Sequence, residues 1–138
     1  MPTTSHPISA AELCDAAELR RALRGFNQAS ALVLRRHGLT KERYELLLAI
    51  RAAHGALQRA TVAELSADLG LAQSSVTQLA RRAQDAGLVA REVSAADGRV
   101  HYLVLTAAAE QRLAAAAADL GPERERLIEL LRALGRPA

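Results

Sequence analysis

The chain has 138 residues, one cysteine and a formal net charge of +3. This length fits one domain, or one domain with a helical extension. A single cysteine excludes an intrachain disulfide and favours a reducing compartment. The sequence contains no apolar run of about 18 residues and opens without the apolar segment of a signal peptide, so we expect a cytoplasmic protein that does not span a membrane.

The N-terminal part of the chain predicts a tail and a long helix. Residues 1–8 are polar and contain two prolines, which indicates a flexible tail. Ser9 and Glu12 have the spacing of a capping box, so we expect a helix from there to about His37. Five of its residues recur at alternating steps of four and three, a narrow seam typical of packing against other helices. They are Leu19, Leu23, Phe26, Ser30 and Val33.

A second helix is predicted after Gly38. Thr40 is placed to cap it, and Leu39 is placed to pack on Tyr44 one turn later. We expect this helix to end near His54 and Gly55 and a short loop to follow. Residues 9–57 would then form the N-terminal dimerisation helix and the second helix.

Residues 61–87 have the pattern of a helix-turn-helix. Thr61 and Glu64 form another capping box, and Gly70 is placed as a left-handed helix cap. A further helix is expected from about Ala72 to Ala86, where Gly87 would stop it. Two helices joined by a short turn that contains glycine are the helix-turn-helix arrangement.

The hydrophobic period changes from helical to alternating after Gly87. Residues 88–94 read LVAREVS and residues 99–106 read RVHYLVLT, with the turn Ala95-Ala96-Asp97-Gly98 between them. Asp-Gly between two β-prone runs is a strong signal for a hairpin. Residues 58–106 therefore predict a winged helix-turn-helix, a domain that commonly binds DNA.

Two helices are expected after the wing, over residues 107–138. Thr106 is placed to cap an alanine-rich helix that runs to Leu120, and Gly121-Pro122 breaks the chain before a last helix. Because alanine buries little area, we expect these helices to gain burial by pairing with a second chain. The predicted fold class is mostly α: a winged helix-turn-helix with a small β-hairpin wing, flanked by N- and C-terminal dimerisation helices.

The predicted second helix of the helix-turn-helix has one apolar side and one polar side. Val76, Leu79, Ala80 and Ala83 share the apolar side. Residues 58–105 hold five basic and five acidic residues, so phosphate binding requires the basic groups to gather on one face. An ordinary solvated helix face is the alternative. The candidate DNA-binding residues are Gln73, Ser74, Ser75, Thr77, Gln78, Arg81, Arg82, Arg91, Asp97 and Arg99.

The chain resembles the MarR family of transcriptional regulators from about Ala11 to Leu134. The resemblance rests on LTKERYELLLAI, TVAELSADLGLAQSSVTQLARRAQDAGLV and DGRVHYLVLT. It departs at Ala72, where family members often have a capping Ser or Asp, and at Ala109, where glycine is common. The missing cap would cost about 1 kcal/mol unless Gln73 or Ser74 replaces it.

The resemblance implies a homodimer that binds a palindromic operator in double-stranded DNA, usually as a repressor relieved by a small ligand or an oxidant. It assigns Asp97 and Arg99 to the wing tip, with Arg99 in the minor groove, where a guanidinium meets the strongest negative potential. For Asp97, a role in the turn itself is the alternative.

Family ligands bind where the dimerisation helices meet the winged helix. The candidates there are Phe26, His37, Tyr44 and Arg51, which would suit a small aromatic or phenolic effector. Some family members sense peroxides through a cysteine in the first helix. Cys14 is followed by Asp15 and lacks aromatic surroundings, so we expect it to be passive.

No catalytic or metal site is expected. The four histidines and the cysteine have no metal-ligand spacing, Ser74 and Ser75 have no nearby His and Asp partners, and there is no Gly-rich phosphate loop. We therefore expect no cofactor and no enzyme activity. Two alternatives to the ligand-relieved repressor stay open: a winged helix used for protein–protein contact, and a redox-sensing repressor that uses Cys14.

Overall fold

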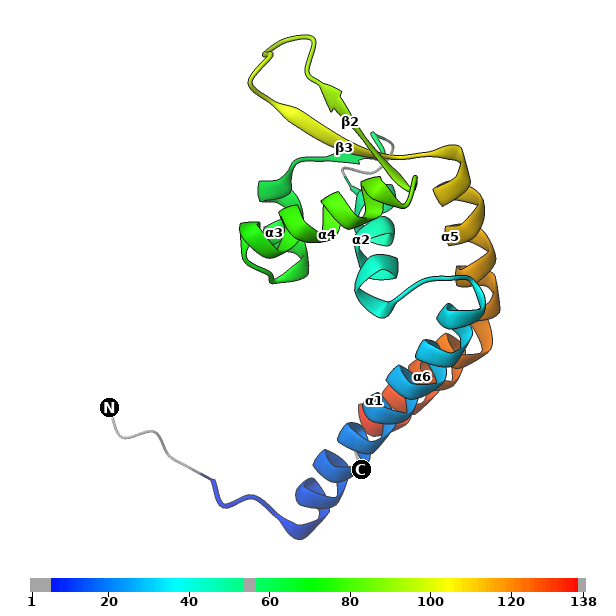
Figure 1. Cartoon of the computed structure of the whole chain (residues 1–138). Coiled ribbons are helices and arrows are strands. Elements are labelled where there is room, and N and C mark those ends of the chain that lie inside the picture. Colours follow the sequence, from blue (N-terminus) through cyan, green and yellow to red (C-terminus); the bar gives the residue numbers. More distant parts are fainter. Residues whose placement is uncertain (1–5, 54–56, 137–138) are drawn as a thin grey trace, which may run out of the picture.

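The computed structural model describes residues 6–53 and 57–136 and separates into a body and an arm (Figure 1). The body holds the winged helix-turn-helix, and the arm holds the first and last helices. The elements are α1 (Ala10–Arg36), α2 (Lys41–Ala52), β1 (Arg59–Ala60), α3 (Val62–Leu69), α4 (Gln73–Asp85), β2 (Val89–Val93), β3 (His101–Leu105), α5 (Ala107–Asp119) and α6 (Gly121–Leu134).

The predicted helix starts are confirmed by their capping contacts. The Ser9 hydroxyl accepts the amide of Glu12 at 3.1 Å, and the Glu12 carboxylate accepts the amide of Ser9 at 2.7 Å. These hydrogen bonds lower the pKa of Glu12. Thr61 and Glu64 form a second capping box, and Gly70 ends α3 in the left-handed conformation with φ +66°. These contacts are local, which is why the sequence predicts them.

The predicted tail and the predicted end of the second helix lie partly outside the described residues. Of the predicted tail, only residues 6–8 are described, and they are exposed and irregular. The second helix ends at Ala52, two residues before the predicted end, and residues 54–56 lie outside the described ranges.

The wing belongs to a three-stranded antiparallel sheet in the order β1-β3-β2. The predicted hairpin is confirmed, and its last strand pair is Val93 with His101. The sequence reasoning missed β1, because residues 59–60 were expected to form a loop. This strand is only two residues long and pairs with Leu103 and Val104 in the middle of β3, so no local sequence pattern predicts it.

One hydrophobic core joins α2 to the winged helix. Leu46, Leu47 and Ile50 of α2 are fully buried together with Leu65 of α3 and Val76 of α4. The apolar side predicted for residues 72–86 is confirmed by this packing. The predicted boundary at residue 57 stays a prediction, although α2 shares its core with the elements that follow.

The arm forms because α6 folds back along α1 (Figure 1). Ser30 of the predicted α1 seam is buried, and Leu19, Leu23, Phe26 and Val33 are half-buried. At Gly121-Pro122 the chain bends rather than forming a loop, since α5 ends at Asp119 and α6 begins at Gly121. Pro122 fits there because the first turn of a helix needs no amide hydrogen bond from it.

Candidate nucleic-acid interface

The outward side of α4 carries hydrogen-bonding and cationic side chains. Six predicted contact residues are exposed on it: Gln73, Ser74, Ser75, Gln78, Arg81 and Arg82. The opposite side is fixed in the core by Val76, Ala80 and Ala83, which are at most 1% exposed. Thr77 is half-buried, and its hydroxyl donates to the carbonyl oxygen of Gln73 at 2.9 Å. Burial of one side therefore presents the other side to solvent as a unit.

The N-terminus of α4 has no side-chain cap. Ala72 occupies the cap position, and neither Gln73 nor Ser74 replaces the missing cap. The preceding turn is held instead by the Ser66 hydroxyl, which donates to the carbonyl oxygen of Leu71 at 2.5 Å. Amide groups at an uncapped helix start favour an anion such as a phosphate.

The loop at the tip of the wing is ordered by side chains within it. The Ser94 hydroxyl accepts the amides of Ala96 and Asp97 at 3.2 and 3.3 Å. The Asp97 carboxylate accepts the amide of Arg99 at 3.0 Å. Asp97 thus shapes the turn, and the Arg99 side chain is exposed beside it. Arg91, on β2, is exposed as well.

The sequence reasoning missed a contact on the sheet beside the wing. The guanidinium of Arg59 lies 4.4 Å from the ring centroid of Tyr102, a cation–π arrangement that links β1 to β3. Arg59 pairs with Val104, which lies on the same face of β3 as Tyr102, so the side chains of Arg59 and Tyr102 share that face. Since β1 itself was not predicted, this contact had no signal in the sequence.

Only two of the four predicted ligand residues come together. Phe26 of α1 and Tyr44 of α2 line one cavity of about 460 Å³. His37 lies outside it, and its Nε2 is 2.7 Å from a carboxylate oxygen of Asp119. Arg51 lies outside it too, and its Nε donates to Glu110 at 3.2 Å. The cation that lines the cavity from the C-terminal helix is Arg124, which the sequence reasoning did not select.

The cavity is apolar with a few polar groups. Its volume lies in the range of small-molecule sites, about 300–1,000 Å³. The buried Ser30 hydroxyl makes no hydrogen bond among the described residues. Burial raises the pKa of Tyr44, and the charge of Arg124 offsets part of that rise. The cavity is lined by Phe26, Asn27, Ser30, Leu34, Lys41, Tyr44, Glu45, Leu48, Ala117, Leu120 and Arg124.

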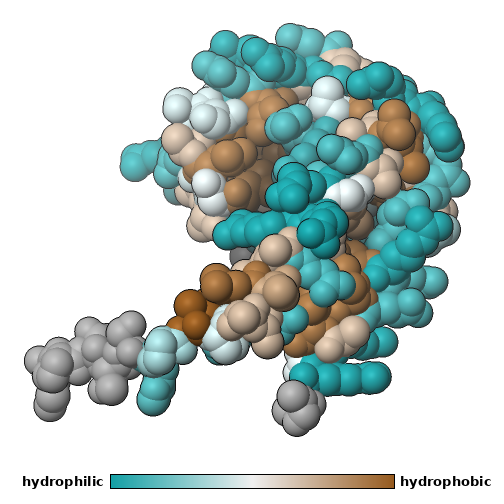
Figure 2. Space-filling view, turned by 90° about the horizontal axis from the view of Figure 1, so that it is seen from below, coloured by the Kyte–Doolittle hydropathy of each residue, from teal (hydrophilic) through white to brown (hydrophobic). Residues whose placement is uncertain are grey.

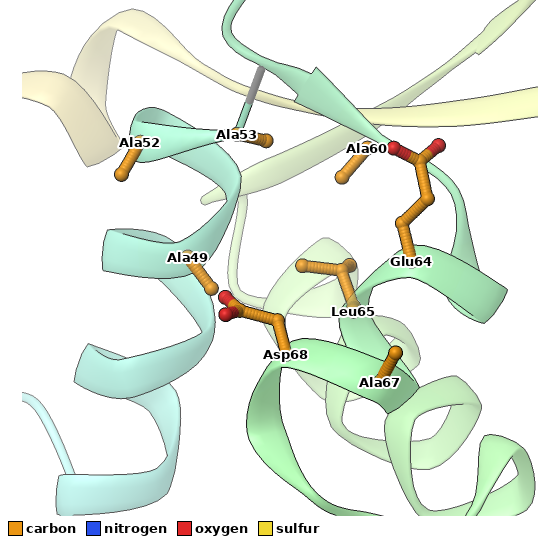
Figure 3. Close-up of a pocket in the computed structure, with 8 residues that line it drawn as sticks. All are labelled: Ala49, Ala52, Ala53, Ala60, Glu64, Leu65, Ala67 and Asp68. Atoms are coloured by element: carbon orange, nitrogen blue, oxygen red, sulfur yellow. The ribbon is translucent and has the colours of Figure 1, made fainter. Parts of the chain in front are cut away.

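A second recess lies between α2 and α3 (Figure 3). Alanine side chains make up most of its lining, and the carboxylate of Asp68 points towards Ala49 on the facing helix. Glu64, the other carboxylate of the lining, already belongs to the capping box of α3. With no aromatic ring or cation in its lining, this recess suits an organic anion less than the Phe26–Tyr44 cavity does.

Residues 6–53 and 57–136 contain neither a metal-binding cluster nor a membrane-spanning helix. No three His, Cys, Asp or Glu side chains there are grouped closely enough to hold a metal ion. None of the helices in those ranges is both long enough and apolar enough to cross a bilayer.

Comparisons with known proteins agree on the fold. The structure is similar to AbsC, a MarR family transcriptional regulator from Streptomyces coelicolor, with 23% identity, a TM-score of 0.77, and 91% and 84% of the two chains covered. Sco3205, a MarR family regulator from the same organism solved in complex with DNA, has 20% identity, a TM-score of 0.74, and 96% and 87% coverage. No curated protein sequence matches the chain.

Two further matches concern the family itself. A family model described as MarR family matches residues 37–100, which span α2, the helix-turn-helix, β2 and the loop of the wing. Transcriptional regulator Tm0710 from Thermotoga maritima is 30% identical, with a TM-score of 0.59 and 88% and 80% of the two chains covered. The chain therefore belongs to the MarR family and is a DNA-binding transcriptional regulator.

Proposed function

We propose that the protein is a repressor that binds a palindromic operator as a homodimer and leaves it when a small ligand binds. In this proposal α4 enters the major groove and the wing contacts the neighbouring minor groove. One observation carries it: residues 73–84 of α4 contain two arginines and no acidic residue, and their polar side chains share the exposed side. Such a surface suits base edges and phosphates.

The direct test is a selection of genomic DNA fragments by the protein. We expect an enriched motif with two inverted half-sites about 10 base pairs apart, because two α4 helices related by a twofold axis meet successive turns of the duplex. Affinity for that motif should fall steeply with salt, since phosphate contacts release counterions. Fragments enriched without a common motif would contradict sequence-specific binding.

The homodimer proposal is supported by apolar surface on the arm. Figure 2 shows hydrophobic residues running along α1 from the end beside the N-terminal residues towards the body. Leu13 and Leu32 of α1 are 55% and 61% exposed, and Ile128 and Leu131 of α6 are about 40% exposed. A monomer would leave these side chains in water, whereas a second arm would cover them.

Sedimentation of two matched variants tests the dimer. Leu131→Arg places a charge among the exposed leucines, and Glu129→Arg makes a change at a nearby exposed position of the same helix. We expect wild type to sediment as a dimer at micromolar concentration. We also expect Leu131→Arg to weaken the dimer more than Glu129→Arg does. A wild-type chain that is monomeric at every accessible concentration contradicts the proposal.

The effector proposal rests on the Phe26–Tyr44 cavity. Helices from the arm and α2 of the body meet there, so a ligand that separates these helices changes the position of the body relative to the arm. Its aromatic rings and the cations Lys41 and Arg124 suit a small aromatic acid or phenol. Benzoate and phenol are the probes: we expect benzoate to release the DNA at lower concentration because only benzoate carries a charge for Arg124.

A specific variant separates this cavity from other binding sites. Phe26→Ala should weaken benzoate-induced release, while Arg51→Gln, a change outside the cavity, should leave that release intact.

A reporter gene downstream of the selected operator tests repression. We expect expression to rise when the gene for the protein is deleted, and a fall would indicate activation.

A winged helix used for protein–protein contact is the second candidate. It is favoured by the charge balance of residues 58–105, where five basic and five acidic residues cancel. Failure to retain any DNA fragment at low salt would favour this candidate.

The domain division follows the main proposal: residues 9–57 and 107–138 supply the dimerisation helices, and residues 58–106 bind DNA.

A further inference from the structure

The strand register of the wing separates its side chains into two faces. Direct antiparallel partners lie on the same face, so Arg91 with Leu103 and Val93 with His101 share one face. At its base this face is buried, since Val89 and Leu103 are each 2% exposed. We call it the inner face, because it continues the surface that packs on the helices. It comprises Val89, Arg91, Val93, His101, Leu103 and Leu105.

The opposite, outer face of the wing holds the only acidic residue of β2 and β3. Glu92 pairs with Tyr102 there, and Ala90 pairs with Val104. Arg59 joins this face from β1 and lies over the ring of Tyr102. The inner face carries Arg91 and His101 and no acid. Charges that cancel in the sequence are therefore separated in space, which leaves a cationic inner face.

His101 lies at the exposed end of the inner face. Its cross-strand partner Val93 is 59% exposed, and His101 is exposed itself. Among the described residues, the imidazole makes no hydrogen bond or ion pair. Its charged neighbours are Arg91 on the same face and Arg99 in the loop, and the carboxylate of Asp97 already accepts the amide of Arg99.

The remaining charged groups near β3 lie elsewhere. Glu92 and Arg59 are on the outer face. Arg51 and Glu110 pair with each other and lie towards the Leu105 end of the strand, where α5 begins. No acid on the strands shares the inner face with His101, so an anion that approaches this face meets only Arg91 and the imidazole.

We propose that His101 is a pH-dependent phosphate contact of the wing, in which the protonated imidazole binds the DNA backbone beside Arg91 and Arg99. This inference rests on the proposed placement of the wing on DNA. Histidine ordinarily changes charge between about pH 5 and pH 8. A nearby phosphate favours the protonated form, so the complex holds more protons than the free protein does. DNA affinity therefore rises as the pH falls through this range.

The experiment measures the affinity of the full chain for a duplex carrying its selected operator, from about pH 5.5 to pH 8.5 and at several salt concentrations. We expect wild-type affinity to increase about three- to tenfold towards low pH, with a salt slope that steepens by about one charge per subunit. His101→Gln should stay near the high-pH affinity throughout. His101→Arg should bind tightly and without pH dependence, because its charge is permanent.

A matched control tests whether the effect is specific to His101, using another exposed histidine. His6→Gln, an exposed histidine before α1, should keep the wild-type pH response. A wild-type affinity that does not change with pH, or a His101→Gln variant that keeps the full response, overturns the proposal. If wild type and His101→Arg bind no duplex at any pH, the proposed operator binding fails, and the His101 proposal fails with it. Thermal unfolding of each variant at both pH extremes shows whether the domain remains folded.

Discussion

The hydroxyl of Thr106 donates a 2.7 Å hydrogen bond to the carbonyl oxygen of Gly87, 19 residues earlier in the chain. The hydroxyl oxygen of Thr106 also accepts the amide of Ala109 at 3.2 Å, and the amide of Thr106 donates to the carbonyl oxygen of Leu88 at 3.0 Å. One residue thus joins the end of α4, the base of the wing and the start of α5. The spacing between α4 and the wing depends on this junction.

We predict that Thr106→Ala lowers the free energy of unfolding by about 1–2 kcal/mol, because it removes both a helix cap and a hydrogen bond to Gly87. Thr106→Ser should keep most of the stability, since serine offers the same hydroxyl. Urea denaturation of the two variants measures the difference. Equal losses in both would assign the effect to the methyl group instead.

Helix starts and the wing were predictable because their signals are local. Ser9, Thr40, Thr61 and Thr106 each accept the amide three residues later, so the cap and its partner lie within one turn of sequence. The apolar side of α4 was predictable too, because a helix with a 3.6-residue period has only one side to bury. In each case the prediction required only neighbours in the chain.

The Phe26–Tyr44 cavity was not predictable in the same way. Phe26 and Tyr44, both predicted ligand residues, line one cavity, but Arg124 joins them only because the bend at Gly121-Pro122 sends α6 back along α1. His37 and Arg51 have the same residue chemistry as good ligand contacts, yet Asp119 and Glu110 already engage them. Each of these pairs joins residues more than 50 positions apart in the sequence, so it depends on tertiary packing, which the hydrophobic period of the sequence does not predict.

Tyr44 should titrate above the usual range of tyrosine. Burial raises the pKa of Tyr44, and the nearby charge of Arg124 lowers it in part. The folded state therefore holds the Tyr44 proton more tightly than the unfolded state. This contribution to stability is present below about pH 10, the ordinary tyrosine value, and is lost as the pH rises through the folded value.

Ultraviolet titration of the tyrosine absorbance measures this pKa, and Tyr44→Phe identifies which of the two tyrosines is responsible. Arg124→Gln should move the titration of Tyr44 further upwards, because it removes the charge that favours the ionised form. A downward shift in Arg124→Gln would mean that burial of Tyr44 depends on the Arg124 side chain more than on its charge.

Cys14 should be dispensable for DNA binding. It lies exposed near the start of α1, away from α4 and the wing. We expect Cys14→Ser to match wild type in operator affinity, with and without hydrogen peroxide, in a gel-shift titration. Peroxide-induced release of DNA by wild type that disappears in Cys14→Ser would instead make Cys14 a redox sensor.

Arg99→Ala and Gln78→Ala should weaken DNA binding in different ways. Arg99 is exposed on the wing loop, so its loss should reduce affinity for most sequences and lower the salt slope by about one charge per subunit. Gln78 is exposed on α4, so its loss should relax the preference at one operator position. A base contact of this kind is worth about 1–3 kcal/mol of discrimination, with little change in the salt slope.

Titrations of both variants on operator and scrambled duplexes, at several salt concentrations, compare the two residues. Because Arg99 and Gln78 belong to separate elements, their free-energy effects in the double variant should add within about 0.5 kcal/mol. Arg82→Gln, on the last turn of α4, removes a charge at another predicted contact residue, so it should lower the salt slope without relaxing the preference at the operator position that Gln78 contacts. If both single variants bind like wild type, α4 and the wing do not form the DNA-binding surface. The protein–protein role would then explain the exposed polar side of α4 better.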